Sequence, residues 1–114
     1  MSGVRRLGAD AEDRAAAFLS SLGYVIVKRG YRSVRGEIDI LAMDGDTLVV
    51  VEVKERTKPG ARPEESVTAA KARRLAGAAR HYLQSVEEPE REIRFDLICF
   101  DFDGMRHHID AFRS

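Results

Sequence analysis

Two apolar segments with charged residues at every second position constrain this chain more than any other feature. Residues 36–42 read Gly-Glu-Ile-Asp-Ile-Leu-Ala, and residues 48–54 read Leu-Val-Val-Val-Glu-Val-Lys. Side chains two positions apart on a strand share a face. Glu52 and Lys54 therefore lie on one face of their strand, and Asp39 shares a face with the residues two positions away from it. Burying carboxylates among Ile, Leu and Val is costly unless a cation compensates them. We therefore expect these charges to serve a chemical purpose.

The Asp-Gly dipeptide at 44–45 is a strong signal that the two segments form a β-hairpin. With a two-residue loop over 44–45, Asp39 and Glu52 lie on the same face but are not directly opposite each other. With a four-residue loop over 44–47, they lie directly opposite each other. Both registers place Asp39, Glu52 and Lys54 on one face, and a three-residue loop would separate them unless a bulge restored the phase. Either even register brings two carboxylates within reach of one hard cation, with an ammonium beside them.

The charges of the chain are segregated although they cancel overall. The 114 residues suit a single domain over 1–114, and the formal net charge is zero. Residues 28–36 carry four bases and no acid before Gly36, residues 54–80 carry eight bases against three acids, and residues 85–103 carry seven acids against two bases. The basic stretches flank the hairpin and would attract a polyanion, unless they are only solvated surface.

Cysteine usage and hydropathy point to the cytoplasm. The lone Cys99 excludes an internal disulfide, fits a reducing compartment and is expected to be a small core residue. Early acids and the lack of a continuous apolar stretch argue against a signal peptide. No apolar run approaches membrane-spanning length, so we expect a soluble protein with no membrane partner.

Periodicity predicts an α/β fold with a mixed sheet. Apolar residues at helical spacing indicate a helix over 9–22 and a second helix from a start between 63 and 68 to about 86. The expected core face of this second helix consists of Leu75, Ala78, Ala79, Tyr82, Leu83 and Val86. The other expected elements are a strand at 24–28, a basic loop at 29–35, the hairpin, a loop at 56–66 and strands at 92–102 and 105–112. The predicted order is α-β-β-β-α-β-β.

With these motifs in place, the chain resembles the PD-(D/E)xK nuclease superfamily, within it the archaeal Holliday-junction resolvases, and most closely the bacterial YraN-type endonuclease family. The likeness covers nearly the whole chain. The residues that carry it are Gly8, Glu12, Ala15, Phe18-Leu19, Gly23-Tyr24, Arg29, Arg32, Gly36-Glu37-Ile38-Asp39, Val51-Glu52-Val53-Lys54, Arg56, Ser66-Val67, Lys71, Arg74-Leu75, Ala79, Tyr82-Leu83, Arg94-Phe95-Asp96 and Ala111-Phe112. Ala11 and Gly30 depart from the Gly and Asn frequent at those family positions. The Asp, Glu and Lys spacing alone is a weak signal, whereas the ordered set with an upstream helical Glu is strong.

The resemblance implies a restriction-endonuclease-like core and metal-dependent hydrolysis of phosphodiester bonds in DNA, branched or junction DNA included. Asp39 and Glu52 would hold Mg²⁺ or Mn²⁺ through oxygen ligands, and the backbone carbonyl of Val53 would complete the set. Lys54 would orient the attacking water or offset charge in the transition state. By resemblance Glu12 joins the site from the first helix, as a ligand through water or as a base. Its competing interpretation is an ordinary first-turn acid favoured by the helix dipole.

Other polar residues have less specific expectations. Arg32, Arg56 and Lys71 would contact backbone phosphates, although each singly is more often a solvated charge. Asp96 is expected to pair locally. The histidines show no metal-ligand spacing and are expected to be surface or packing residues: His81, His107 and His108.

Three interpretations remain open at this stage. The first is a nuclease, as a monomer or as a homodimer carried over from the resolvases. The second is a nucleic-acid-binding module that keeps the fold without turnover, and the third is an interaction domain driven by its segregated charges. For the charged triad itself, the competing interpretation is a structural salt bridge.

Overall fold

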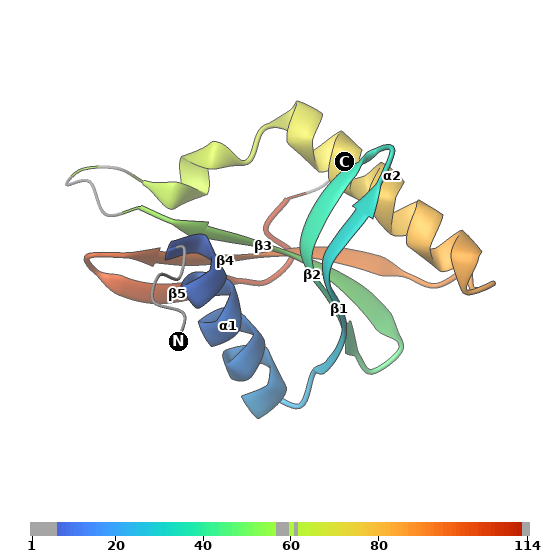
Figure 1. The fold of residues 1–114 in the computed structure, drawn as a ribbon, viewed down its shortest axis with the longest axis horizontal. Coiled ribbons are helices and arrows are strands. Elements are labelled where there is room, and N and C mark those ends of the chain that lie inside the picture. Colours follow the sequence, from blue (N-terminus) through green and yellow to red (C-terminus); the bar gives the residue numbers. More distant parts are fainter. Residues whose placement is uncertain (1–6, 57–59, 61, 113–114) are drawn as a thin grey trace, which may run out of the picture.

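Two helices, one short 3-10 helix and five strands build the chain. The computed structural model describes residues 7–56, 60 and 62–112. Figure 1 shows the arrangement of these elements. In chain order they are α1 (Leu7–Ser21), β1 (Val25–Ser33), β2 (Gly36–Asp44), β3 (Thr47–Glu55), the 3-10 helix η1 (Pro63–Ser66), α2 (Ala69–Ser85), β4 (Ile93–Asp101) and β5 (Gly104–His108). The predicted order is wrong at one point, because it omits η1 within the loop expected at 56–66. Residues 57–59 and 61 of that loop lie outside the described residues.

The strands form one mixed sheet in the order β1-β2-β3-β4-β5. Three neighbouring pairs are antiparallel, and β3 with β4 is parallel. A parallel pair requires a crossover connection, and here η1 and α2 supply it. The mixed α and β architecture is therefore confirmed.

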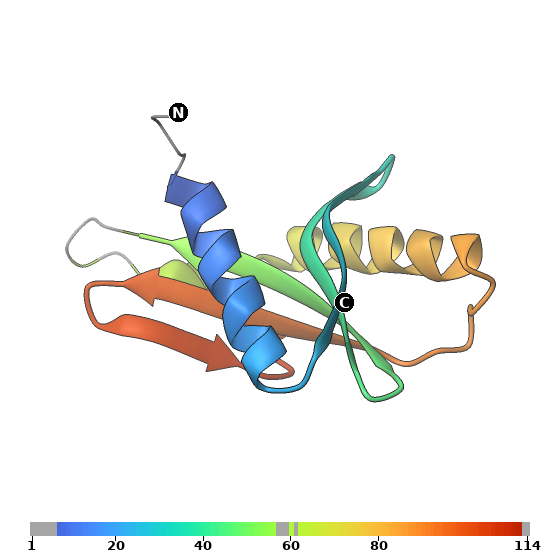
Figure 2. The same ribbon diagram turned by 60° about the horizontal axis from the view of Figure 1, so that its bottom comes forward.

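The helices cover opposite faces of the sheet, as Figure 2 shows. Alternate residues of β3 divide between two hydrophobic clusters: Leu48 and Val50 pack with α2, whereas Val49 and Val51 pack with α1. All four side chains are fully buried. A strand covered on both faces is continuously apolar, which explains the Val-rich composition of β3.

The hairpin between β2 and β3 has the register that places Asp39 opposite Glu52. The pairs run from Asp44↔Thr47 through Met43↔Leu48 to Ile40↔Val51. The pairing expected for the four-residue loop is thus confirmed, although Asp44 and Thr47 also pair. The register built on a 44–45 loop is wrong, because Gly45 (φ +60°) is the first central residue of the turn rather than the second. A type II′ turn places glycine at that first position.

The first strand is longer than predicted. Residues up to Ser33 pair with β2, so the expected basic loop at 29–35 is mostly strand and only Val34 and Arg35 form its turn. A register shift between Ile26 and Lys28 marks a bulge, which increases local twist. The tip of the β1–β2 hairpin reaches α2, visible in Figure 1, and Ile38 packs in the cluster with α2, whereas Ile40 packs in the cluster with α1.

The ends of α2 and of the sheet also differ from expectation. The hydroxyl of Thr68 caps α2 by accepting from the Lys71 N–H at 3.1 Å, which fixes the helix start. Val86, expected in the core, lies beyond the helix and is 41% exposed. The last strand ends at His108 instead of 112, because the following residues turn back: the Ala111 N–H donates to the Phe95 carbonyl at 2.7 Å.

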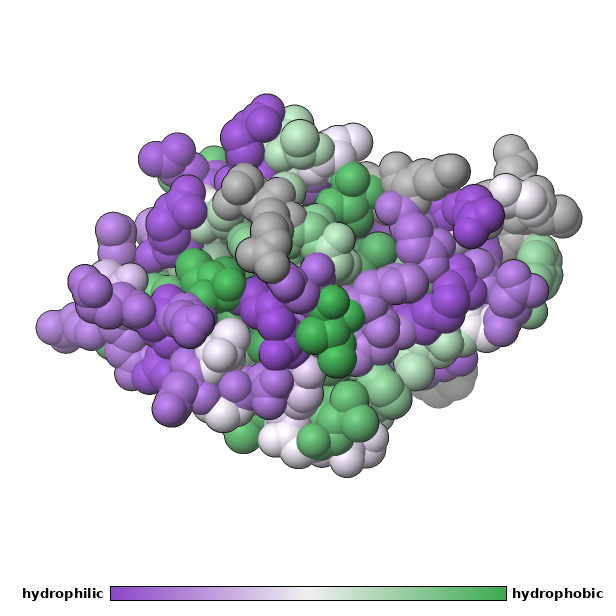
Figure 3. Space-filling view, turned by 180° about the vertical axis from the view of Figure 1, so that it is seen from behind, coloured by the Kyte–Doolittle hydropathy of each residue, from purple (hydrophilic) through white to green (hydrophobic). Residues whose placement is uncertain are grey.

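The surface carries its apolar residues singly. The large exposed hydrophobic side chains are Leu22, Val25, Val34, Val86, Phe102, Met105 and Ile109. The face drawn in Figure 3 is mostly hydrophilic, with hydrophobic residues in small separate patches. Single exposed apolar residues are normal on a protein surface. Within the described part of the chain, neither helix is long and apolar enough to cross a membrane.

Candidate functional site

Asp39 and Glu52 face each other where the β2–β3 ladder ends. The last backbone pair is Ile40↔Val51, and the next step along the same register joins Asp39 to Glu52. Here Oδ2 of Asp39 accepts the Val53 N–H at 2.9 Å, so a carboxylate replaces the backbone acceptor of a continued ladder. This bond fixes the Asp39 carboxyl group against the edge of β3, on the α2 face of the sheet.

Two ammonium groups compensate the buried charge of Glu52. Its side chain is only 3% exposed, and its Oε2 lies 3.3 Å from the Lys54 Nζ. The Lys71 Nζ, which comes from the first turn of α2, contacts the same oxygen. Lys54 is two residues along β3 and thus on the same face, as the sequence predicted. A carboxylate this deeply buried requires such partners.

These groups line one cavity of about 310 Å³ between the hairpin and α2. The residues lining it are Gly36, Glu37, Asp39, Glu52, Val53, Lys54, Lys71, Arg74 and Leu75. The predicted convergence of Asp39, Glu52 and Lys54 on one pocket is therefore present. Sequence reasoning placed Lys71 among surface phosphate contacts and missed Arg74, although their i, i+3 spacing on a helix already put them on neighbouring positions.

The surroundings of Asp39 perturb its carboxyl group. Burial, first, and the nearby Glu52 charge together raise the pKa of Asp39 to about 7, against the lowering effect of the Val53 N–H. For Lys71, burial opposes the ammonium form, yet the bond to Glu52 leaves its pKa raised overall. The cavity thus brings Glu52 and its two lysine partners together with Asp39, whose carboxyl group stays partly protonated near neutrality.

Glu12 approaches this site from the opposite layer. It lies on α1, its side chain is 30% exposed, and its carboxylate is 3.9 Å from the Arg29 guanidinium. Burial raises its pKa, Arg29 lowers it, and the charges of Glu37 and Glu52 raise it again. Glu12 is therefore within electrostatic range of Glu52, but it is not among the residues that line the cavity.

The other predicted contacts lie around the site. Arg32 is 81% exposed and pairs with Glu37 at 3.2 Å, and Glu37 lines the cavity from its rim. Arg56 lies just past β3 and donates to the Glu55 carbonyl at 2.9 Å. Neither arginine contacts the Asp39 and Glu52 pair.

Two polar networks outside this cavity involve residues for which the sequence predicted only local pairing or packing. Asp96 is fully buried and accepts from Arg94 at 2.9 Å and from the Asp110 N–H at 3.1 Å, which confirms its expected local pairing. His107, 8% exposed, shares a hydrogen bond of 2.8 Å with the same carboxylate. The network is a buried structural anchor for the end of the sheet.

A second cluster brings together three possible metal ligands that are not spaced in the sequence like a metal-binding motif. Glu64, Cys99 and His108 place one donor atom each within 4.8 Å of one another. Its carboxylate is already bound by Arg106 at 2.8 Å and by His108 at 2.9 Å. Burial raises the pKa of the Cys99 thiol to about 12, which keeps it protonated. The cluster as it stands is a hydrogen-bonded network rather than a set of open ligands.

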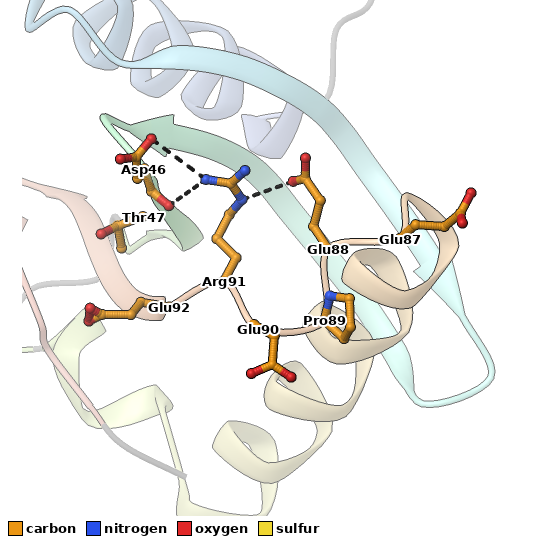
Figure 4. A pocket seen from close by; sticks show the side chains of 8 residues that line it. All are labelled: Asp46, Thr47, Glu87, Glu88, Pro89, Glu90, Arg91 and Glu92. Carbon is orange, nitrogen blue, oxygen red and sulfur yellow. Dashed lines mark hydrogen bonds and ion pairs between the residues drawn. The ribbon is translucent and has the colours of Figure 1, made fainter.

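Another cavity, of about 460 Å³, lies at the turn end of the hairpin and is drawn in Figure 4. Arg91 spans it, donating to the Asp46 carbonyl at 2.7 Å and to Glu88 at 2.9 Å. The remaining side chains are mostly exposed acids of the connector after α2. No paired, buried titratable groups occur there among the residues drawn, in contrast to the cavity of Asp39 and Glu52.

Comparison with known proteins gives a consistent family. The model of "Uncharacterised protein family UPF0102" matches residues 11–100. A UPF0102 protein of Chlorobaculum tepidum is 46% identical over 87% of this chain and 78% of its own length. One of Chlorobium limicola is 43% identical over 93% and 91%, and one of Symbiobacterium thermophilum is 47% identical over 82% and 80%. These names state no activity.

Proposed function

The chain belongs to the uncharacterised protein family UPF0102, and we propose that it is a metal-dependent nuclease that hydrolyses phosphodiester bonds of DNA. We further propose that its sheet and helices form the restriction-endonuclease-like core of the PD-(D/E)xK superfamily. The observation that carries the proposal is the pairing of Asp39 and Glu52 across two strands, on one cavity, with Lys54 beside them.

The donor set suits a hard divalent cation such as Mg²⁺ or Mn²⁺. Oδ2 of Asp39 and Oε2 of Glu52 make the contacts to N–H and ammonium groups, and the two carboxyl groups also share a hydrogen bond that a cation between them would replace. The N–H and C=O of one strand residue point to the same side, so the Val53 carbonyl also points toward Asp39. The mutual repulsion that raises the pKa of Asp39 is the kind of strain that a divalent cation relieves. The residues present therefore fit such an ion.

Each side chain then has a role that its position supports. A divalent cation held there would polarise the scissile phosphate and lower the pKa of a water molecule. The Val53 N–H keeps Asp39 oriented, and Lys54 supplies positive charge beside the phosphate as negative charge accumulates on its oxygens. In the balanced reaction the water oxygen bonds to phosphorus and one water proton goes to a base. The bond from phosphorus to one ester oxygen breaks, and the leaving oxygen keeps the electron pair and takes a proton from solvent. Family resemblance alone makes Glu12 the candidate base, since Glu12 does not line the cavity.

One observation favours the alternative of a nucleic-acid-binding module without turnover. Lys71 and Lys54 both contact Glu52, so the chain neutralises this carboxylate with its own side chains. If that neutralisation is permanent, no cation enters and the pocket only binds phosphate. A cleavage assay distinguishes the nuclease from the binding module without turnover.

The test is a cleavage assay with purified protein over branched, flapped, duplex and single-stranded oligonucleotides, with Mg²⁺, Mn²⁺ or EDTA. We expect cutting that requires the metal and is abolished by Asp39→Asn and by Glu52→Gln. The matched control is Asp46→Asn, an isosteric change of a fully exposed turn carboxylate, which should cut like the wild type. Cutting that persists in both site variants would refute the assignment of the site, and binding without cutting by the wild type would favour the alternative.

A further inference from the structure

A groove lined by four arginines adjoins the candidate site. Its residues are Arg35, Ala70, Arg73, Arg74, Gly77 and Arg80, and it encloses about 620 Å³. We call it the arginine groove. It shares Arg74 with the cavity that holds Asp39 and Glu52, so the two hollows adjoin at that residue.

Helix periodicity and two small residues shape the groove. Positions 70, 73, 74, 77 and 80 follow the i, i+3, i+4, i+7 pattern of a single helix face. Ala70 and Gly77 supply little or no side chain, so the floor lies close to the helix backbone. The arginine side chains form the walls.

Gly77 has a specific packing role in this groove. A Cβ added at that position would lie 3.2–3.4 Å from the stem of Arg35, which closes the groove from the β1–β2 turn. A glycine inside a helix costs about 1 kcal/mol relative to alanine. The chain accepts this cost where the Arg35 stem lies directly on α2. Gly36 likewise packs its backbone against the Arg74 Cβ, at 3.5 Å from an added Cβ.

The four guanidinium groups have no acidic partner among the residues that the structure describes. Several arginines elsewhere are paired with acids: Arg29 with Asp13 at 2.7 Å, Arg94 with Asp44 at 2.8 Å, and Arg106 with Asp101 at 2.7 Å. Four like charges kept together without counter-ions repel one another, and a bound polyanion relieves that repulsion.

We infer that the arginine groove binds the sugar–phosphate backbone of a polynucleotide, and so leads the strand along α2 to the pocket of Asp39 and Glu52. This inference rests on the proposed nuclease function for the direction of the strand, but not for the binding itself. Arg73 and Arg80 are separated by about 10 Å along the helix axis, which corresponds to about three nucleotides of one duplex strand. Guanidinium groups pair with phosphates in bidentate fashion. Contacts of this type position a strand without reading its sequence.

The test measures binding of the full chain to a fluorescein-labelled oligonucleotide, single-stranded or duplex, by anisotropy in EDTA, where no metal-dependent cleavage occurs. The double variant Arg73→Gln/Arg80→Gln is compared with the matched double variant Arg14→Gln/Lys28→Gln, which removes two exposed cations from α1 and β1, together with the contact of Arg14 over the Phe100 ring. We expect the groove variant to bind roughly tenfold more weakly or worse, and its slope of log K against log salt to fall by about two. The matched variant should bind like the wild type.

Equal losses in both variants, or no loss in the groove variant, would overturn the inference. Tighter binding to anionic phospholipid vesicles than to either oligonucleotide would also overturn it. The result is separable from the proposed function: groove-dependent binding without cutting refutes only the nuclease, whereas metal-dependent cutting with unchanged affinity of the groove variant refutes only the groove.

Discussion

Replacing Asp39 by asparagine should stabilise the protein in the absence of metal, because the wild-type site holds an unfavourable carboxylate. Burial and the Glu52 charge raise the pKa of Asp39 from 3.8 to about 7 in the folded state. The folded protein therefore binds more protons than the unfolded chain between these pH values. The free energy of unfolding falls as pH rises through that window and is lowest, as far as Asp39 contributes, above it. Asparagine keeps the acceptor for the Val53 N–H and removes the charge.

The size of the effect follows from the same shift. At about 1.36 kcal/mol per pKa unit, the penalty has an upper limit of about 4 kcal/mol at pH 8 and about 1 kcal/mol at pH 4.5. Because Asp39 and Glu52 influence each other, we expect a gain of about 2–4 kcal/mol for Asp39→Asn at pH 8. For a domain of this size that corresponds to a rise of roughly 10 °C or more in Tm.

The assay is urea or thermal unfolding in EDTA at both pH values, with Asp46→Asn as the control. The control carboxylate is fully exposed in the hairpin turn, so its change should stay within about 0.5 kcal/mol at either pH. A destabilised Asp39→Asn variant at pH 8, or an equal gain at both pH values, would refute the argument. Either result would mean that Asp39 is not held as a strained carboxylate.

Three further outcomes are expected. Millimolar Mn²⁺ should raise the Tm of the wild type, since a ligand of the folded state stabilises it, and should leave the Tm of Asp39→Asn unchanged; equal shifts would place the ion elsewhere. Lys71→Met should lower the free energy of unfolding in EDTA by about 1–3 kcal/mol, because Glu52 keeps only Lys54 as partner, and Mn²⁺ should restore part of that loss. Gly77→Ala should change stability by less than about 1 kcal/mol, as gained helix propensity offsets crowding of Arg35, yet should weaken oligonucleotide binding; unchanged affinity would contradict the role given to Arg35.

Strand periodicity explains why the site could be predicted from the sequence in part. Residues two apart share a face and residues opposite each other across a ladder do too, so parity alone put Asp39, Glu52 and Lys54 together. Parity left the register open between two even choices. The register depends on which position of the turn Gly45 occupies, because glycine readily takes a positive φ. The sequence contains this glycine but does not show whether it is the first or the second central residue of the turn.

The remaining features depend on tertiary contacts that no local pattern contains. β1 continues through the basic segment because β2 offers a full ladder to pair with, which overrides the polar composition of that segment. From the sequence, Lys71 could be interpreted only as a surface cation. Its contact with Glu52 depends on where α2 begins and on how this helix packs against the sheet. The arginine groove likewise needs the β1–β2 turn to meet α2, and a register shift between Ile26 and Lys28 contributes to that twist.

The charge balance links the pocket to the groove. Glu52 faces Lys54 and Lys71, and Asp39 is partly protonated near neutral pH, so the pocket carries an excess of positive groups around Glu52. A divalent cation held by Asp39 and Glu52 would displace the remaining Asp39 proton and would compete with Lys71 for the Glu52 carboxyl group. Lys71 and Arg74 lie on one helix and both line the pocket, so an ammonium released from Glu52 is placed where a phosphate entering from the arginine groove would meet it. On the proposed function, Lys71 would pair with Glu52 in metal-free protein, as the structure shows, and would contact phosphate once a cation takes that carboxyl group.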